Sequence, residues 1–235
     1  MLIARLEALK QFYSIISLLE EKLGAPQRLQ NCSNQVHWPK RGVYFFFEHG
    51  EQRSHSGNGP RIVRVGTHAL KTGSRTTLWT RLCQHRGQIG SGGGNHRGSI
   101  FRLLVGTALI VRDGHECQTW GDGSSAPREI RDAELMLERA VSEIIRTMPF
   151  LWLAVEDDPG PKSLRGYIER NAISLLSNYR RLPLDPPSDD WLGRWCDRER
   201  VRDSGLWNQN HVDETFDPHF LRCLETLVQR VEPAQ

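Results

Sequence analysis

The sequence lacks the features that mark membrane and secreted proteins. No run of about 20 apolar residues, the length needed to cross a bilayer, occurs in the 235 residues. Charges at Arg5, Glu7 and Lys10 interrupt the apolar start of the chain, which is not the pattern of a signal peptide. The five cysteines are an odd number and include no Cys-x-x-Cys pair. We therefore expect no disulfide scaffold, no cysteine zinc ribbon and no membrane association, but a protein of the reducing cytoplasm.

A further absence is local. No Asp or Glu lies between Glu51 and Asp113, although this segment holds ten Lys and Arg residues. The formal net charge of +3 therefore divides into +10 for the segment and −7 for the rest of the chain. Genomic base composition would explain why 26 of the 31 basic residues are arginine, but it does not explain the missing acids. The asymmetry predicts a polyanionic partner such as nucleic acid, because guanidinium groups suit phosphates and base edges.

Apolar periodicity and turn-forming residues divide the chain into helices and strands. Helical spacing predicts helices over residues 2–23, 78–86, 129–146, 163–177 and 218–231. Strands are predicted over residues 42–48, 61–65 and 150–155, with the turn-forming residues 50–60 joining the first two as a hairpin. Ser74 or Thr76 is expected to cap the helix over 78–86, and Ser163 the helix over 163–177. The apolar residues 99–110 fit either a helix or a strand.

Two of the predicted helices carry side chains suited to phosphate chemistry. Arg81 and His85 are four residues apart and share a helix face, where a guanidinium can bind a phosphate and an imidazole can move a proton. Glu169 lies at the edge of an apolar stripe, where a carboxylate can bind a hard cation. Structural alternatives stay open for both: a solvated Arg–His pair, and an ion pair between Glu169 and Arg165.

Other residues give weaker signals. Tyr44 lies in the middle of a predicted strand, where a tyrosine most often packs in a core. The glycine-rich residues 90–98 do not end in Gly-Lys-Ser/Thr, so they are no nucleotide-binding P-loop and fit either a nucleic-acid clamp or a surface loop. Several histidines lack the spacing of a zinc motif, so we expect no zinc. They are His68, His85, His96 and His211.

Taken in order, these elements resemble the GIY-YIG nuclease superfamily. Gly42-Val43-Tyr44 matches the first signature, and Arg64-Val65-Gly66 matches the second, with Arg64 in place of its usual tyrosine. The resemblance covers about residues 37–178, with an insertion near 89–146. It implies an α+β fold in which a small three-stranded antiparallel sheet is flanked by helices. Residues 1–36 are then an N-terminal helical arm, and residues 179–235 a C-terminal extension packed on the core.

The resemblance also implies an active site. The family's arginine and histidine correspond to Arg81 and His85, and its metal-binding glutamate corresponds to Glu169, which would hold Mg²⁺ or Mn²⁺. The family's late asparagine has two candidates in this chain, Asn178 and Asn208. Arg81 would neutralise the phosphate during the reaction, and the metal would stabilise charge on the leaving oxygen.

Tyr44 would help to activate the attacking water, in concert with His85. Because a free tyrosine ionises at about pH 10, it would need a cationic neighbour, for which Arg64, Lys71 and His68 are candidates. Contacts to DNA are expected from polar and basic side chains around the site and in the insertion. These are Lys71, Arg75, Arg86, Asn95, His96, Arg97, Arg102 and Asn208.

The function that the resemblance implies is metal-dependent cleavage of double-stranded DNA. The long hairpin loop and the insertion are similar to additions by which GIY-YIG restriction endonucleases read bases, so we expect a sequence-specific restriction or defence enzyme of a restriction-modification system. Cleavage of both strands favours a homodimer. Two alternatives stay open: a structure-specific or single-strand repair nuclease, and a catalytically inactive nucleic-acid-binding module, which Arg64 favours.

Overall fold

The computed structural model describes residues 2–35 and 37–233. Within this part of the chain, four strands form one antiparallel sheet in the order β1-β4-β2-β3. They are β1 (Gln27–Arg28), β2 (Gly42–Gln52), β3 (Pro60–Gly66) and β4 (Pro149–Ala154). The last three lie where the sequence predicts strands. The expectation of a three-stranded sheet misses β1, because two residues are too short to show an alternating pattern.

The helices largely follow the predicted ranges. They are α1 (Leu2–Leu23), α2 (Leu78–Arg86), α3 (Ile100–Asp113), α4 (Arg128–Ala133), α5 (Leu135–Thr147), α6 (Leu164–Leu176), α7 (Glu199–Ser204) and α8 (His219–Gln229), with the 3-10 turns η1 (Leu29–Asn31), η2 (His96–Gly98) and η3 (Leu192–Trp195). The apolar segment left open between helix and strand is α3. The helix predicted over 129–146 is divided into α4 and α5 at Glu134. Thr77 caps α2 in place of Ser74 or Thr76, whereas Ser163 caps α6 as predicted.

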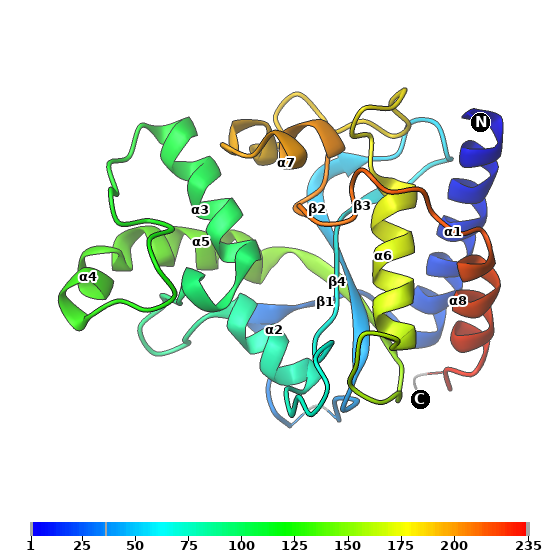
Figure 1. The fold of residues 1–235 in the computed structure, drawn as a ribbon, viewed down its shortest axis with the longest axis horizontal. Coiled ribbons are helices and arrows are strands. Elements are labelled where there is room, and N and C mark those ends of the chain that lie inside the picture. Colours follow the sequence, from blue (N-terminus) through cyan, green and yellow to red (C-terminus); the bar gives the residue numbers. More distant parts are fainter. Residues whose placement is uncertain (1, 36, 234–235) are drawn as a thin grey trace.

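The sheet separates two hydrophobic cores. Alternate residues of β2 point to opposite faces, so Val43 and Phe45 enter one core while Tyr44 and Phe46 enter the other. Helices α1, α6 and α8 cover the first face, and α2, α3 and α5 cover the second (Figure 1). Tyr44 therefore points toward the side of the sheet on which α2 and the insertion pack.

Residues between 180 and 228 pack against both faces of the sheet. Val212 and α8 belong to the first core, and Trp191 and Trp207 belong to the second. The main-chain N–H of Trp207 donates to the carbonyl of Val63 in β3 at 2.7 Å. This bond holds the segment after α7 against β3, next to the second signature. The division of the chain near residues 36 and 178 stays a prediction.

Two expectations from composition concern the chain as a whole. Among the described residues, no helix combines the length and the apolar character that a membrane crossing requires. The cysteines, all of which the structure describes, are free thiols.

Candidate active site

A cavity of about 590 Å³ brings together most of the predicted catalytic residues. Its lining includes Tyr44, Arg64, His68, Arg81 and Glu169. His85, the sixth, is fully buried and bonds to Tyr44 from behind the cavity wall. Lys71 and Asn208, which were expected to contact DNA, also line the cavity. Residues from β2, β3, α2 and α6 therefore meet at one hollow.

The packing of the two signature strands fixes Tyr44. In the register of the hairpin, Tyr44 lies opposite Gly66, the last residue of β3. A Cβ at Gly66 would lie 2.3 Å from the Tyr44 hydroxyl oxygen and 2.4 Å from the ring Cζ. A Cβ at Gly42 would lie 2.5 Å from the carbonyl oxygen of Leu153 in β4. Both signature glycines are required because the tyrosine ring and the neighbouring strand occupy the space of a side chain.

His85 links Tyr44 to the start of α3. Its Nε2 lies 2.8 Å from the Tyr44 hydroxyl, and its Nδ1 lies 2.7 Å from Ser99 Oγ. Burial, reinforced by the charges of nearby arginines, holds the pKa of His85 well below its usual range. The imidazole is therefore neutral at pH 7. A neutral imidazole can accept a proton at one nitrogen while the other is held by a partner, so His85 can receive the proton of Tyr44. The alternative of a solvated surface histidine is wrong.

Arg64, in the position of the usual second tyrosine, is a buried cation beside Tyr44. It donates to the main-chain oxygen of Trp207, and its guanidinium lies 4.7 Å from the centre of the Phe101 ring. Burial lowers the pKa of Arg64, whereas neighbouring Tyr44 and Glu169 favour its charged form. Since arginine keeps its proton in proteins, a permanent positive charge borders the hydroxyl of Tyr44.

Glu169 projects from α6 toward the end of β3. Its Oε1 accepts the main-chain N–H of Thr67 at 3.0 Å, and its Oε2 makes no hydrogen bond to any residue that the structure describes. Burial raises the pKa of Glu169, and the charge of Arg64 and the Thr67 bond oppose this. The alternative ion pair with Arg165 is not formed, because Arg165 pairs with Asp157. One carboxylate oxygen at the cavity wall is therefore open to a ligand.

The donor set fits a divalent cation that keeps most of its water. In residues 2–35 and 37–233, no cluster of three His, Cys, Asp or Glu side chains could enclose a metal ion. Mg²⁺ commonly binds through one or two carboxylates together with waters and substrate phosphates, which suits the open oxygen of Glu169. His68 also lines the cavity, and neither of its ring nitrogens has a hydrogen-bond partner in the described chain. Burial and the charge of Arg165 lower the pKa of His68 to about 4, so its ring is neutral and both nitrogens lie buried at the site.

Arg81 and Lys71 add positive charge to the cavity. Arg81 donates to Gln84 Oε1 at 2.9 Å and to the carbonyl of Gly98 at 3.1 Å, which directs the guanidinium along the cavity wall. Lys71 is exposed and forms no ion pair within the described residues. Both cations can therefore meet an anionic ligand without first breaking a salt bridge.

Asn208, rather than Asn178, is the late asparagine that reaches the cavity. Its amide accepts the N–H of Val65 at 3.2 Å and donates to the carbonyl of Val65 at 2.8 Å, and so extends the edge of β3. Asn178 bonds instead to Arg5 and to the main chain of Leu184. Because Val65 occupies both ends of the Asn208 amide, the structure favours support of β3 over the expected contact with DNA.

Three residues of the insertion that were expected to bind DNA are buried against acidic side chains. Arg102 pairs with Glu138, Arg97 pairs with Glu134, and His96 Nδ1 lies 3.0 Å from Glu138; none of the three side chains is more than 3% exposed. The expectation for His96, Arg97 and Arg102 is wrong, because acids 36 to 42 residues further along the chain already bond to all three side chains. These contacts hold η2 and α3 against α5 and its N-cap residue Glu134.

The other expected DNA contacts lie outside this cavity. Arg86 donates to the carbonyl of Cys32, and its guanidinium lies 4.8 Å from the centre of a Trp79 ring. The side chain of Asn95 caps η2. These partners argue against DNA contact by Arg86 and Asn95. Arg75 is exposed in the segment before α2, and its contact with DNA stays a prediction.

Among the cavity residues that the sequence did not predict for the site are Thr67 and His211. Thr67 directly follows the second signature, so its position next to the site could have been read from the hairpin. His211 lies in a turn-rich segment without a motif, and nothing in its spacing pointed to the site. It also lines a neighbouring cavity of about 490 Å³, which shares Glu169 with the first.

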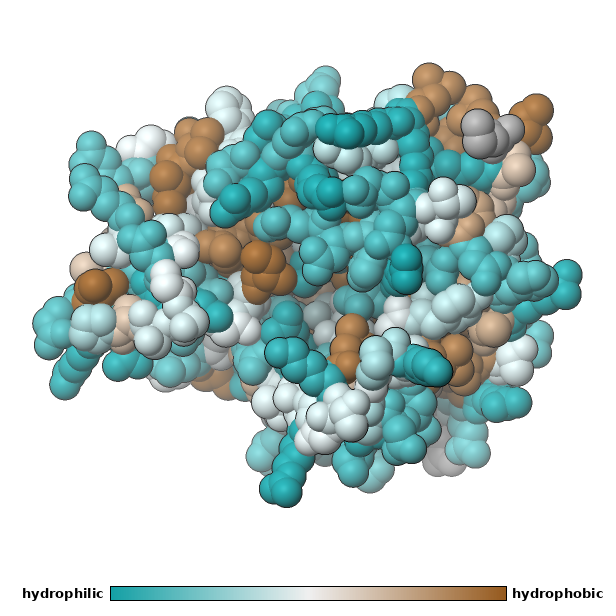
Figure 2. All heavy atoms as spheres, viewed as in Figure 1, coloured by the Kyte–Doolittle hydropathy of each residue, from teal (hydrophilic) through white to brown (hydrophobic). Residues whose placement is uncertain are grey.

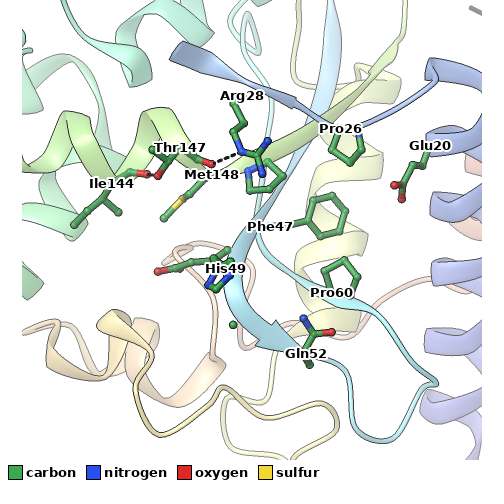
Figure 3. Close-up of a pocket in the computed structure, with 13 residues that line it drawn as sticks. Glu20, Pro26, Arg28, Phe47, His49, Gln52, Pro60, Ile144, Thr147 and Met148 are labelled. Carbon is green, nitrogen blue, oxygen red and sulfur yellow. Dashed lines mark hydrogen bonds between the residues drawn. The ribbon is translucent and has the colours of Figure 1, made fainter. Parts of the chain in front are cut away.

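A larger cavity, of about 840 Å³, lies beside the far end of β2 (Figure 3). Its lining is largely apolar, with Phe47, Ile144, Met148 and three prolines. Glu48, which also lines it, accepts the indole N–H groups of two tryptophans at 3.0 Å. None of the predicted catalytic residues borders this cavity, so the smaller, more polar one is the candidate active site.

Comparison with known families agrees with the geometry. The family model of the GIY-YIG domain matches residues 3–234, whereas the sequence motifs that carry the resemblance span residues 37–178. No curated protein and no solved structure gives a significant match. The match includes the segment of Asn208 and His211 that borders the cavity. The chain therefore belongs to the GIY-YIG domain family, a family of nucleases.

Proposed function

We propose that this protein is a metal-dependent endonuclease that hydrolyses phosphodiester bonds of double-stranded DNA. The observation that carries the proposal is the convergence of Tyr44, Arg64, Arg81 and Glu169 on one cavity, with His85 bonded to Tyr44 behind it. A module that only binds nucleic acid needs the cations, but it needs neither a buried tyrosine–histidine pair nor a carboxylate with an open oxygen.

The cations of the cavity are suited to hold the scissile phosphate. Arg64 and Arg81 present guanidinium groups, which bind phosphate oxygens in pairs, and Lys71 adds a mobile charge at the rim. Hydrophilic atoms cover most of the surface over β3 and α6 (Figure 2), as expected for a face that meets the DNA backbone.

Tyr44 and His85 form the path for the proton of the attacking water. As the water oxygen bonds to phosphorus, its proton passes to the Tyr44 oxygen and the Tyr44 proton passes to His85 Nε2. The bond from phosphorus to the leaving oxygen breaks, and this oxygen keeps the electron pair and takes a proton from solvent. Burial, reinforced by nearby arginines, opposes the protonation of His85. The negative charge of a bound phosphate offsets the contribution of the arginines, so proton transfer becomes less unfavourable when substrate is in place.

Glu169 would hold the divalent cation, Mg²⁺ or Mn²⁺, through its open oxygen. When bound, such an ion supplies positive charge that stabilises the phosphate in the transition state. Thr67 keeps the carboxylate aimed at the cavity through its hydrogen bond to the other oxygen, at 3.0 Å.

A restriction or defence role fits the additions around this site. Of these additions, α3 borders the cavity through Ile100, and we propose that the helices α3–α5 read bases. The loop that joins β2 to β3 lies at the other end of β2, beside the larger cavity, so the structure does not favour base reading by this loop. Cleavage of both strands needs two sites, which two copies of the chain as a homodimer would supply. Such an enzyme acts in the cytoplasm, where invading DNA arrives.

Incubation with duplex genomic DNA tests this function. In the presence of Mg²⁺ or Mn²⁺ we expect discrete fragments, and with EDTA none. Cleavage confined to flaps or single strands would replace the restriction role by a repair role. Tight binding of DNA without cleavage in either metal would contradict the nuclease proposal and favour an inactive binding module.

A further inference from the structure

His211 borders both cavities at Glu169. The second cavity, of about 490 Å³, shares three lining residues with the first: Leu70, Glu169 and His211. Figure 1 shows the segment after α7 passing across β3 and α6 on its way to α8. His211 lies in this segment, at the boundary between the two cavities.

The main chain at His211 is held in a conformation that is uncommon for residues other than glycine. Its φ is +65°, in the left-handed region, which asparagine, aspartate and histidine adopt more readily than other residues with a Cβ. Ser174 Oγ of α6 donates to the carbonyl of His211 at 2.9 Å, and Ser177 Oγ donates to the carbonyl of Val212 at 2.7 Å. The hydroxyls of Ser174 in α6 and of Ser177, its C-cap residue, thus fix His211 in place beside Glu169.

A carboxylate fixes the ring as well. His211 Nδ1 lies 2.8 Å from Glu214 Oε1, and Arg170 pairs with the other oxygen of Glu214. Burial would raise the pKa of Glu214, but the bonds from His211 and Arg170 outweigh it and lower the pKa below its usual range. An ionised Glu214 accepts the Nδ1 proton, and Nε2 makes no hydrogen bond within the described chain. The ring is about one-third exposed, so Nε2 is open to a ligand.

The second cavity is lined by basic side chains that a phosphate can bind, of which Arg170 is also paired with Glu214. Lys162, Arg170 and His211 line it, and Glu169 is the one acid among its lining residues in the described chain. A DNA strand carries one phosphate per nucleotide. A strand with one phosphate beside Glu169 in the first cavity must place the next one close by, and the second cavity is adjacent.

We propose that the second cavity holds the DNA phosphate next to the cleaved one, and that His211 donates to this phosphate from a protonated Nε2 while its Nδ1–H stays bonded to Glu214. Glu214 is the positioning residue that orients the ring. The inference rests on the proposed function, since it takes the substrate to be a DNA strand. The proposal adds to the active site one residue, His211, and one subsite that the family's signature residues do not include.

The variant H211N tests the contact with little disturbance of the fold. Asparagine tolerates the left-handed conformation, but its shorter side chain cannot reach the position of Nε2. We expect H211N to bind a duplex in EDTA at low salt about tenfold more weakly than the wild type, as for a lost hydrogen bond to a charged group. E214Q should weaken binding less, and H219N, at an exposed histidine of α8, should not weaken it.

A second readout is the side-chain ¹⁵N resonance of His211, assigned from its absence in H211N. It should shift when the duplex is added to the full chain in EDTA. Wild-type affinity in H211N together with an unshifted resonance would overturn the inference and leave the nuclease proposal standing. If the His211 resonance of the wild type shifts and H211N binds more weakly, the subsite is supported. If the wild type also fails to cleave in Mg²⁺ or Mn²⁺, the nuclease proposal is contradicted while the subsite stands.

Discussion

Replacing Gly66 with alanine should disable the site without removing any catalytic group. The new Cβ would lie 2.4 Å from Tyr44 Cζ, where ordinary contact begins at about 3.4 Å, so the ring must move by about 1 Å. The Tyr44–His85 bond of 2.8 Å would then lengthen beyond hydrogen-bond range. A displacement of this size in a reacting group reduces the rate by about a hundredfold. Overpacking at a buried position also costs about 1–3 kcal/mol of unfolding free energy.

Single-turnover cleavage by G66A, with saturating metal and well below its melting temperature, measures the effect. G90A is the matched control, because a Cβ at Gly90 meets no atom within 4 Å. The double variant Y44F/G66A should be no slower than Y44F, since both changes act through the same hydroxyl. Wild-type cleavage by G66A, or full additivity of the two changes, would refute the account of Tyr44.

Three further predictions concern charge. R102M should lower the unfolding free energy by about 3–5 kcal/mol in urea denaturation, because the buried Glu138 loses its arginine and keeps only its bonds to His96; a change below about 1 kcal/mol would contradict the ion pair. K71A should reduce the slope of log affinity for DNA against log salt by about one, whereas R102M should leave the slope unchanged; equal slopes for wild type and K71A would exclude that phosphate contact. His68 has its pKa lowered to about 4 in the folded chain, against about 6.5 when unfolded, so the unfolded chain binds the proton first and stability falls as the pH drops. Between pH 7 and pH 5, His68 should lower the free energy of unfolding by about 2 kcal/mol. This pH-dependent decrease should be absent in H68Q and unchanged in H219Q.

The sequence predicts the elements of the fold better than their pairing. Strong apolar periodicity or β-rich runs marked β2, β3, β4 and most helices to within a few residues. The strand β1 was not predicted, because Gln27 and Arg28 form a strand only by pairing with Pro149 and Phe150, far along the chain. The apolar sequence of α3 is compatible with a helix or a strand, and its packing against α5 and η3 favours the helix.

The site follows a similar division. Gly42, Tyr44 and Gly66 belong to a local hairpin whose register can be read from short motifs. The burial of Arg97 and Arg102 could not be predicted from the sequence, because it depends on acidic residues far along the chain. An excess of positive charge in a segment therefore does not mean an excess of positive charge on the surface. His211 reaches the site only through the path of a segment that carries no pattern.

The most direct test of the central claim is metal-dependent cleavage by E169Q. Glutamine can still accept the Thr67 N–H that Glu169 Oε1 accepts at 3.0 Å, so the fold and the binding of DNA in EDTA should be retained. With Mg²⁺ or Mn²⁺ the single-turnover rate should fall about a hundredfold or more, as for the loss of a principal transition-state interaction. E129Q, at an exposed position of α4, should cut like the wild type. Cleavage by E169Q at the wild-type rate would contradict the assignment of this cavity as the active site.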